Sequence, residues 1–374
     1  MTAVSFPDPT QPRPPQVKPT RAVMVRDVPV GGGNPVVIQS MTNTDTEDVD
    51  ATLAQIARLH AAGCRIVRVA VPNRRAVDAF ANIRAGTNVP LVADIHFQHE
   101  LAVAAIEAGA DKVRINPGNI GGADHTRRVI DAAKAARIPV RIGVNSGSLE
   151  AAVLTKHGHP TPAALAESAL LNVRMVEGFG FDDIVVSIKA SDVPTTISAC
   201  AILAGQCDRP QHIGITEAGT VRTGTIRSAV GLGVLLNRGI GDTIRVSLAG
   251  DPVEEIFAAR EILKSLKLAS GPTVIACPTC GRTRIDVAGL AKQVEERVAG
   301  IAETVTIAVM GCVVNGPGEA READIGIAGG AGEGRIFIKG REVDKVKESE
   351  LVDRLMERLP ALLAEKNASV ARRE

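Results

Sequence analysis

The chain alternates short runs rich in Val and Ile with longer segments whose apolar residues recur at helical spacing. Runs that are apolar on both faces are typical of parallel strands covered on both sides. The eight runs before residue 250 are Val36–Met41, Arg65–Val71, Pro90–His96, Lys112–Pro117, Val140–Ser146, Asp183–Lys189, His212–Gly219 and Thr243–Ala249. The helical segments between them include Ala51–Ala62, Gln98–Ala108, Ala123–Ala136 and Thr225–Asn237. This alternation predicts an α/β fold, a closed (β/α)8 barrel.

An open, doubly wound sheet is the other fold that such an alternation suggests. It normally has fewer strands and a Gly-rich turn after the first strand. Here the first strand is followed by Thr42-Asn43-Thr44, and Gly31-Gly32-Gly33 precedes it. We expect those glycines to form the hairpin turn of an amino-terminal cap, and we therefore favour the barrel.

The pattern changes at Ala269-Ser270-Gly271-Pro272, beyond which the chain predicts a small α+β domain. We expect a strand at Thr273–Ala276, a helix at Asp286–Val298, a strand leading to Cys312, two Gly-rich strands within Ala323–Arg341 and a charged terminal helix. The predicted domains are therefore a barrel over residues 22–269 and a second domain over residues 270–374. Residues 1–21 hold six prolines and lack a signal peptide's apolar segment, so we expect a disordered tail.

Composition excludes several classes of partner. Aromatic residues make up 2% of the chain, which argues against the stacking platforms of single-strand nucleic-acid binding. A net charge of +1 gives no overall attraction to DNA or to anionic membranes, and no apolar run reaches the roughly 18 residues of a membrane span. Six cysteines without a secretory signal indicate reduced thiols. We expect a cytoplasmic protein with no nucleic-acid or membrane partner.

The predicted strands carry charged residues toward their carboxyl ends, where barrels of this kind hold their active sites. Five strands contribute cations and two contribute carboxylates; these are Arg68, Arg114, Arg141, Lys189 and Arg245, with Asp94 and Glu217. A single arginine in a strand more often pairs with a neighbouring carboxylate. The excess of cations as a set is costly to bury without an anion, and guanidinium groups suit phosphate oxygens. We therefore predict a phosphate or diphosphate ester as ligand, with the two carboxylates as candidates for proton transfer or hydroxyl binding.

Three cysteines in the second domain have the spacing of a metal or redox site. Cys277-Pro278-Thr279-Cys280 is a C-x2-C pair, and Cys312 follows it. Zinc needs a fourth ligand, and because no His lies beyond His212, that ligand would be acidic. A redox pair leaves Cys312 unexplained, whereas three thiolates around an iron–sulfur cluster leave one iron for a weaker ligand or for substrate. Glu319 follows in a Gly-rich turn, and spacing alone favours a surface carboxylate there.

Several motifs occur in the order that one known family shows. They are Gln39-Ser40-Met41-Thr42-Asn43-Thr44, Ala93-Asp94-Ile95-His96-Phe97, Arg114-Ile115-Asn116-Pro117-Gly118-Asn119, Gly143-Val144-Asn145, Ile215-Thr216-Glu217-Ala218-Gly219, Cys277-Pro278-Thr279-Cys280 and Gly311-Cys312-Val313-Val314-Asn315-Gly316-Pro317-Gly318-Glu319. Over about residues 22–365 the chain resembles the bacterial 4-hydroxy-3-methylbut-2-enyl diphosphate synthases of the methylerythritol phosphate route to isoprenoids. Residues 1–21 lie outside the resemblance.

The resemblance implies an activity, a cofactor and site residues. The substrate would be 2-C-methyl-D-erythritol 2,4-cyclodiphosphate, opened and dehydrated with two electrons from flavodoxin or ferredoxin. A [4Fe–4S] cluster would be held by Cys277, Cys280, Cys312 and Glu319. The implied substrate contacts are Arg68, Arg114, Arg141, Asn145, Lys189, Arg245 and Ser247. Glu217 would be the acid/base group, with Asp94 and His96 near the substrate.

The order of the domains adds an expectation about assembly. The last barrel helix runs away from the carboxyl ends of the strands, so the second domain begins at the opposite face. We therefore expect a head-to-tail homodimer, in which each cluster domain covers the partner's barrel.

Two other functions fit parts of the sequence. A pterin transferase similar to dihydropteroate synthase would use the barrel but leave the cysteines idle. A non-enzymatic iron–sulfur electron carrier would use the cysteines but leave the charged strand ends unexplained. Iron and sulfide content separates both from the synthase.

Overall fold

The computed structural model describes residues 19–312, 322–330 and 332–370. The chain forms two compact units, residues 1–268 and residues 269–374, and each has its own hydrophobic core. No helix within the described residues is long and apolar enough to span a membrane.

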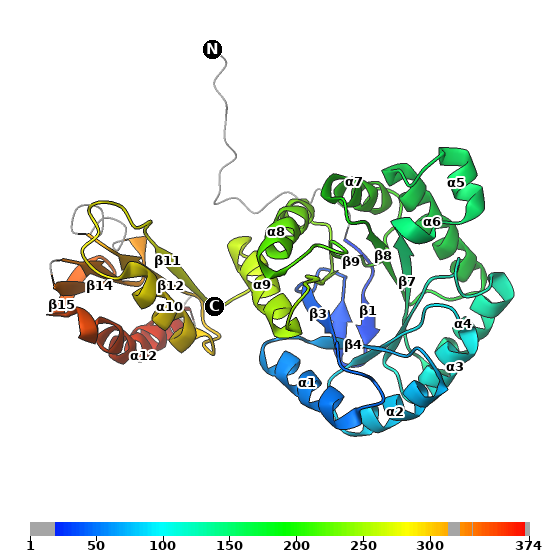
Figure 1. Ribbon diagram of the computed structural model, residues 1–374, viewed down its shortest axis with the longest axis horizontal. Helices are drawn as coiled ribbons and strands as arrows, with labels where there is room; N and C mark the ends of the chain where they lie inside the picture. The colour runs from blue at the N-terminus through cyan, green and yellow to red at the C-terminus, as the bar shows by residue number, and fades with distance from the viewer. Residues whose placement is uncertain (1–18, 313–321, 331, 371–374) are drawn as a thin grey trace, which may run out of the picture. The chain divides into compact units, whose positions relative to one another are not determined.

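The first unit is a parallel eight-stranded barrel inside a ring of helices (Figure 1). Its strands are β3 (Val37–Met41), β4 (Ile66–Ala70), β5 (Leu91–Asp94), β6 (Lys112–Ile115), β7 (Val140–Asn145), β8 (Ile184–Lys189), β9 (His212–Ile213) and β10 (Thr243–Ile244). The hydrogen-bonded order is β8-β7-β6-β5-β4-β3-β10-β9, and a bridge between Val186 and Gln211 joins its two ends. The predicted (β/α)8 fold is confirmed.

Helices follow the strands as the apolar spacing predicts. They are α1 (Val49–Ala61), α2 (Arg74–Ala85), α3 (His99–Glu107), α4 (Ala123–Ala136), α5 (Ala151–His157), α6 (Pro162–Gly178), α7 (Val193–Ala204), α8 (Val221–Asn237) and α9 (Pro252–Ser265), with a short 3-10 turn at Ser146–Ser148. Capping side chains fix several starts: Asp251 accepts a hydrogen bond from the backbone of Val253 at the start of α9.

An antiparallel hairpin, β1 (Val23–Val25) and β2 (Val28–Val30), lies at the amino end of the barrel. Its valines share a small core with Val37, Ile66 and Val92, which lie at or near the starts of β3, β4 and β5. The prediction that Gly31–Gly33 form the hairpin turn was wrong. Arg26, at a φ of 56°, occupies that turn, and the three glycines follow β2.

Strand residues alternate between the helices and the barrel interior, because side chains on a strand point to opposite faces in turn. On β4, Val67 and Val69 join the core shared with the helices. Ile66 contacts the amino-terminal hairpin's core, and Arg68 forms an ion pair with Asp94 on the neighbouring strand. The charged residues of the strands therefore fill the inside of the barrel.

The last two barrel strands are shorter than their sequence suggests. Regular pairing stops after Ile213 and Ile244, although the predicted runs continue to Gly219 and Ala249. Beyond that point the two segments keep single backbone bonds, such as the bond from Arg245 to the carbonyl of Ile213. The apolar pattern reports burial, and these segments are buried without a regular ladder.

The second unit is a five-stranded sheet with order β11-β12-β13-β14-β15. Its elements are β11 (Pro272–Ala276), α10 (Val287–Val298), β12 (Val305–Met310), β13 (Ile325–Gly329), β14 (Glu333–Ile338), β15 (Arg341–Lys347), a 3-10 turn at Glu348–Glu350 and α12 (Leu351–Val370). The first three strands are parallel, and β14 and β15 are antiparallel to their neighbours. Residues of α10 and α12, such as Val294 and Leu355, pack on Ile307 and Ile325 of the sheet.

Candidate functional site

Charged residues of four neighbouring strands lie together inside the barrel. Asp94 on β5 lies 3.6 Å from Nε of Arg68 on β4 and 3.2 Å from Nη1 of Arg114 on β6. Nε2 of His96, just beyond β5, lies 3.5 Å from Oδ2 of Asp94, the oxygen that Arg68 also contacts. Arg141 on β7 stands opposite Arg114 in the strand register. The register of parallel strands thus brings together residues that are about 70 positions apart in the sequence.

The Asp94 carboxyl is held in its ionised form. Burial raises its pKa, but the charge of Arg68, the hydrogen bond with His96 and the charge of Arg114 together hold that pKa well below its usual range. Asp94 therefore acts as a fixed negative charge that orients two arginines. It is a poor proton donor at neutral pH.

Arg141 is buried without a matching carboxylate. Arg141 is only 1% exposed. Its Nε and Nη1 atoms have no hydrogen-bond partner among the described residues. Nε of Arg114 is unpaired in the same way. Burial lowers the pKa of Arg141 well below its usual range, and the nearby charges of Arg68 and Arg114 add to the effect. Unpaired, buried guanidinium groups favour an anionic ligand.

The other side of the barrel adds two more cations. Lys189 ends β8 and is buried, which lowers the pKa of its ammonium group well below the usual range. Arg245, just after β10, contacts both oxygens of Glu255 at 3.2 Å. Glu255 comes from α9 and also accepts hydrogen bonds from Ser40 and from the backbone of Leu248.

Sequence reasoning missed two members of this interior. Glu255 lies in the first turn of α9, where an acidic residue usually marks only a helix start. Lys112 opens β6, away from the strand end, yet it is completely buried inside the barrel. The alternation of inward positions on β6, with Lys112 two residues before Arg114, is the signal that could have found it.

Asn145 and Ser247 lie at the predicted end of the barrel. Asn145 is the last residue of β7, and with its amide in the satisfied orientation its oxygen accepts a hydrogen bond from Nη2 of Arg114 at 3.2 Å. Ser247 is half-buried beyond β10, two residues after Arg245. Both add neutral hydrogen-bonding groups beside the cations.

Glu217 occupies the turn between β9 and α8. Its carboxylate is exposed, and its backbone has a φ of 52°, in the left-handed region that non-glycine residues seldom adopt. This turn follows the carboxyl end of β9, so Glu217 lies on the same side of the barrel as the cationic cluster, which is formed by Arg68, Arg114, Arg141, Lys189 and Arg245. Its strained backbone at an exposed position is typical of functional turns.

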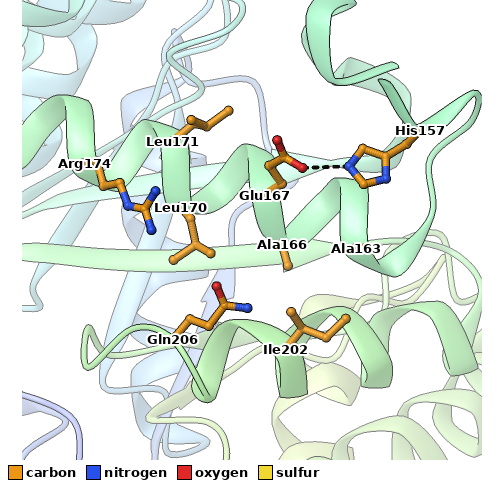
Figure 2. A pocket seen from close by; sticks show the side chains of 9 residues that line it. All are labelled: His157, Ala163, Ala166, Glu167, Leu170, Leu171, Arg174, Ile202 and Gln206. Atoms are coloured by element: carbon orange, nitrogen blue, oxygen red, sulfur yellow. Dashed lines mark hydrogen bonds and ion pairs between the residues drawn. The ribbon is translucent and has the colours of Figure 1, made fainter. Parts of the chain in front are cut away.

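A hollow of about 200 Å³ opens at the ends of β4 and β5. Asp94, His96 and Phe97 line it, and Phe97 is 70% exposed. A second hollow of about 330 Å³ lies outside the barrel between α6 and α7, where His157 and Glu167 pair with each other at 2.7 Å (Figure 2). The first hollow adjoins the cationic cluster, so we take it as the entrance to the candidate site.

The cysteines of the second unit are brought together by its parallel strands. Cys277 directly follows β11, and Cys312 lies two residues after β12, its parallel neighbour. The backbone N–H of Gly311 donates to Sγ of Cys277 at 3.1 Å. The carboxyl ends of two adjacent strands therefore hold Cys277 and Cys312 at one edge of the sheet.

Cys280 lies in the exposed loop between β11 and α10. Hydrogen bonds from the backbone and side chain of Arg282 lower the pKa of its thiol. A hydrogen bond with Cys280 and the charges of Cys280 and Cys312 in turn raise the pKa of Arg282, so this guanidinium lies near both cysteines. Cys280 and Cys312 thus lie near one cation at a solvent-accessible position, and a nearby cation favours the thiolate form that metal ligands need.

The donor set fits a thiolate-bound metal group, although Glu319 lies outside the described residues. Within the described part of the chain, no three His, Cys, Asp or Glu side chains already stand close enough to hold a metal ion. By contrast, burial raises the pKa values of Cys64 and Cys200 in the barrel to about 12, so neither thiol ionises readily. Only the second unit offers accessible thiols at adjacent strand ends among the residues that the structure covers.

Two family models match the chain in sequence order. A GcpE TIM-barrel domain matches residues 20–260, and a GcpE protein C-terminal domain matches residues 273–361. The chain belongs to the GcpE family. Together the two matches cover both units, so the family accounts for the barrel and for the cysteine-bearing domain at once.

Curated relatives agree over nearly their whole length. The chain is similar to proteins named 4-hydroxy-3-methylbut-2-en-1-yl diphosphate synthase (flavodoxin). The relative from Nitratidesulfovibrio vulgaris is 58% identical over 94% of this chain and 92% of the relative. The relative from Geobacter sulfurreducens is 55% identical over 93% of this chain and 99% of the relative. The relative from Caldanaerobacter subterraneus is 54% identical over 92% and 98%. The resemblance inferred from the motifs is confirmed.

Solved structures with similar barrels are far more distant. A dihydropteroate synthase from Xanthomonas albilineans is 17% identical, with a TM-score of 0.47 over 66% of this chain and 98% of that one. An N-acetylneuraminic acid synthetase from Leptospira borgpetersenii is 12% identical, with a TM-score of 0.49 over 75% and 97%.

Proposed function

We propose that the protein is a 4-hydroxy-3-methylbut-2-enyl diphosphate synthase. It converts 2-C-methyl-D-erythritol 2,4-cyclodiphosphate into 4-hydroxy-3-methylbut-2-enyl diphosphate. Two electrons and two protons enter, the C–O bond that closes the diphosphate ring breaks, and one oxygen leaves as water. The observation that carries the proposal is the buried, unpaired Arg141 within a cationic barrel of a family whose curated relatives bear this name. The transferase and electron-carrier alternatives explain only one unit each.

The barrel residues bind and orient the substrate. The guanidinium groups of Arg114 and Arg141 donate to the diphosphate oxygens, and Asp94 holds Arg114 in place. Arg68, Lys189 and Arg245 add positive charge, and Asn145 and Ser247 add neutral hydrogen bonds. Glu217 moves a proton at a substrate hydroxyl, with His96 beside it at the entrance.

The second unit holds the redox group. Cys277, Cys280, Cys312 and Glu319 are the proposed ligands of a [4Fe–4S] cluster. The parallel pairing of β11 and β12, which carry Cys277 and Cys312 just beyond their carboxyl ends, supports this proposal. A cluster bound there supplies electrons one at a time to the substrate. Flavodoxin, which the relatives' name contains, is the proposed donor, and ferredoxin is the other one-electron carrier to test. Six free cysteines suit a cytoplasmic location.

The path of the chain supports a head-to-tail homodimer. The helix α9 starts beyond the carboxyl end of β10 and, at about 1.5 Å per residue, runs back for roughly 20 Å. At the end of α9, the backbone N–H of Leu268 donates a hydrogen bond to the carbonyl of Leu263. Strand β11 begins at Pro272. The connecting residues reach about 14 Å at roughly 3.5 Å each. Because α9 carries the chain away from the candidate site within the barrel, we propose that a partner's second unit supplies the electrons.

An anaerobic assay with the cyclic diphosphate and a chemical reductant tests the function directly. The expected result is formation of the hydroxylated butenyl diphosphate in proportion to iron content. Air-free protein that contains iron and sulfide yet leaves the cyclic diphosphate unchanged would contradict the proposal.

Replacing Arg141 with Met should weaken substrate binding without destabilising the free protein. Loss of charge-assisted hydrogen bonds costs roughly 1.5–3 kcal/mol, which is about tenfold or more in affinity. Because the group it removes is buried and unpaired, the free energy of unfolding should stay the same or rise. Calorimetric titration and thermal melting measure the two effects.

Arg209→Met is the matched control for that experiment. Arg209 is equally buried but pairs with Glu177 at 2.7 Å and with Asp182 at 2.6 Å, away from the strand ends. Glu177 and Asp182 are partly exposed, so the loss of Arg209 should lower stability by about 1.5–3 kcal/mol while affinity persists. Lower stability with normal affinity in Arg141→Met would show that this arginine is structural.

Glu217→Gln should lower turnover while substrate binding persists. Gln keeps the size and the hydrogen bonding of Glu but cannot exchange a proton, and a positioned acid or base contributes about 10²–10⁴-fold to a rate. Steady-state kinetics and calorimetry on anaerobic protein separate the two effects. Unchanged turnover would remove Glu217 from the proton transfer.

A further inference from the structure

A second polar layer lies inside the barrel below the arginines. Lys112 is two residues before Arg114 on β6, so both side chains face the interior. Lys112 is completely buried, and its Nζ atom lies 3.5 Å from Oε1 of Gln39 on β3. His212 on β9 is also completely buried; its Nδ1 contacts Oγ1 of Thr243 at 2.8 Å.

This layer is short of negative charge. In the part of the chain that the structure describes, no carboxylate forms an ion pair with Lys112, and Nε2 of His212 and Nε2 of Gln39 have no hydrogen-bond partner. The charged or titratable groups of the barrel interior, strand by strand, are Arg68 on β4, Asp94 on β5, Lys112 and Arg114 on β6, Arg141 on β7, Lys189 on β8, His212 on β9 and Arg245 beyond β10. The cations of the barrel interior therefore outnumber its two carboxylates, Asp94 and Glu255.

Electrostatics in the free protein therefore oppose a charge on Lys112. Burial lowers the pKa of its ammonium group well below the usual range, and the charges of Arg141 and Arg68 lower it further. Without the extra proton, the amine can still donate a hydrogen bond to Oε1 of Gln39. Arginines keep their protons under nearly all conditions, so the lysine is the group that responds when the local charge changes.

We propose that Lys112 is a positioning residue that takes up a proton from solvent when the cyclic diphosphate binds, so that substrate binding and protonation are coupled. The inference rests on the proposed function, since it needs a dianion in the arginine cluster. Two negative charges beside Arg68 and Arg141 offset the cations that oppose the proton on Nζ. The protonated Nζ then donates to Oε1 of Gln39, and its positive charge attracts the bound anion.

The experiment is calorimetric titration of anaerobic protein with the cyclic diphosphate, in buffers that differ in ionisation enthalpy. Each phosphorus of this ring carries one strongly acidic oxygen, so the ligand itself does not titrate near neutral pH. We expect uptake of up to about one proton through Lys112 in wild-type protein, and we expect Kd to rise with pH, by at most about tenfold per pH unit, over the range in which binding takes up that proton. Lys189 contributes separately, because it lies in the site itself.

Two variants isolate Lys112. Lys112→Met should take up about one proton fewer than wild type, and its Kd should depend less steeply on pH. Gln39→Glu places a carboxylate beside Nζ, so Lys112 should be charged already, and uptake should fall by the same amount even if Lys112→Met folds poorly. A merely structural Lys112 would shift Kd equally at every pH.

The outcomes separate this inference from the function. Wild-type protein that binds the cyclic diphosphate without proton uptake overturns the coupling and leaves the synthase proposal standing. Uptake that is unchanged in both variants also overturns it. Protein that does not bind the cyclic diphosphate at all contradicts the proposed function, and the coupling with it.

Discussion

Replacing Cys312 with Ser should remove the iron–sulfur centre and reduce synthase activity to background. Cys312 follows β12 beside Cys277, at the edge where the thiols gather. Serine keeps the size of the side chain, but its hydroxyl is a much harder and less acidic ligand than a thiolate. Iron and sulfide analysis, the brown colour of anaerobic protein and the reductive assay are the measurements.

Cys200→Ser is the matched control for that experiment. Cys200 is fully buried in α7, and its thiol only contacts the carbonyl of Ile188 at 3.8 Å. Its replacement should leave iron content unchanged at some cost in barrel stability. Full iron content in Cys312→Ser, or stoichiometric zinc in wild-type protein purified without air, would exclude the proposed ligand set.

The barrel was predictable from sequence because its strands are buried on both faces. That burial gives continuous runs such as Ile66–Ala70, whose only polar residue, Arg68, stands out against Val67 and Val69. Strand ends were less predictable, since β9 and β10 lose regular pairing while the chain stays buried. β15 was missed altogether: its seven residues are mostly charged, as is common for an exposed edge strand, and they resemble a loop in sequence.

Site residues were predictable from sequence where a charged side chain lies within a predicted strand. Arg114 is the penultimate residue of β6, and Arg141, the second residue of β7, stands opposite it in the strand register. Lys112 and Glu255 were not predicted, because their roles depend on residues that are distant in sequence. Lys112 contacts Gln39 on another strand of the barrel, and Glu255, on a helix, binds Arg245. Sequence spacing does not report such contacts. Glu319 remains a prediction from family resemblance, since it lies outside the described residues.

Mixing Glu217→Gln with Cys280→Ser should restore activity that neither variant has alone. In a head-to-tail dimer, each active site combines one chain's barrel with its partner's cluster domain. A mixed dimer then contains one site with an intact Glu217 and three intact cysteines, and a second site with both defects. If subunits exchange freely, about half of the dimers are mixed and each has one working site, so activity should return to roughly a quarter of the wild-type value.

A second mixture supplies the control. Glu217→Gln with Arg141→Met places both defects in barrels, so every site in the mixed dimer has one defective barrel, and activity should not rise above the mean of the two variants measured separately. Mass spectrometry of differently tagged subunits verifies that mixed dimers form in both cases. If the first mixture forms mixed dimers that stay inactive, each barrel must receive electrons from its own chain. The direction of α9 would then no longer argue for a partner.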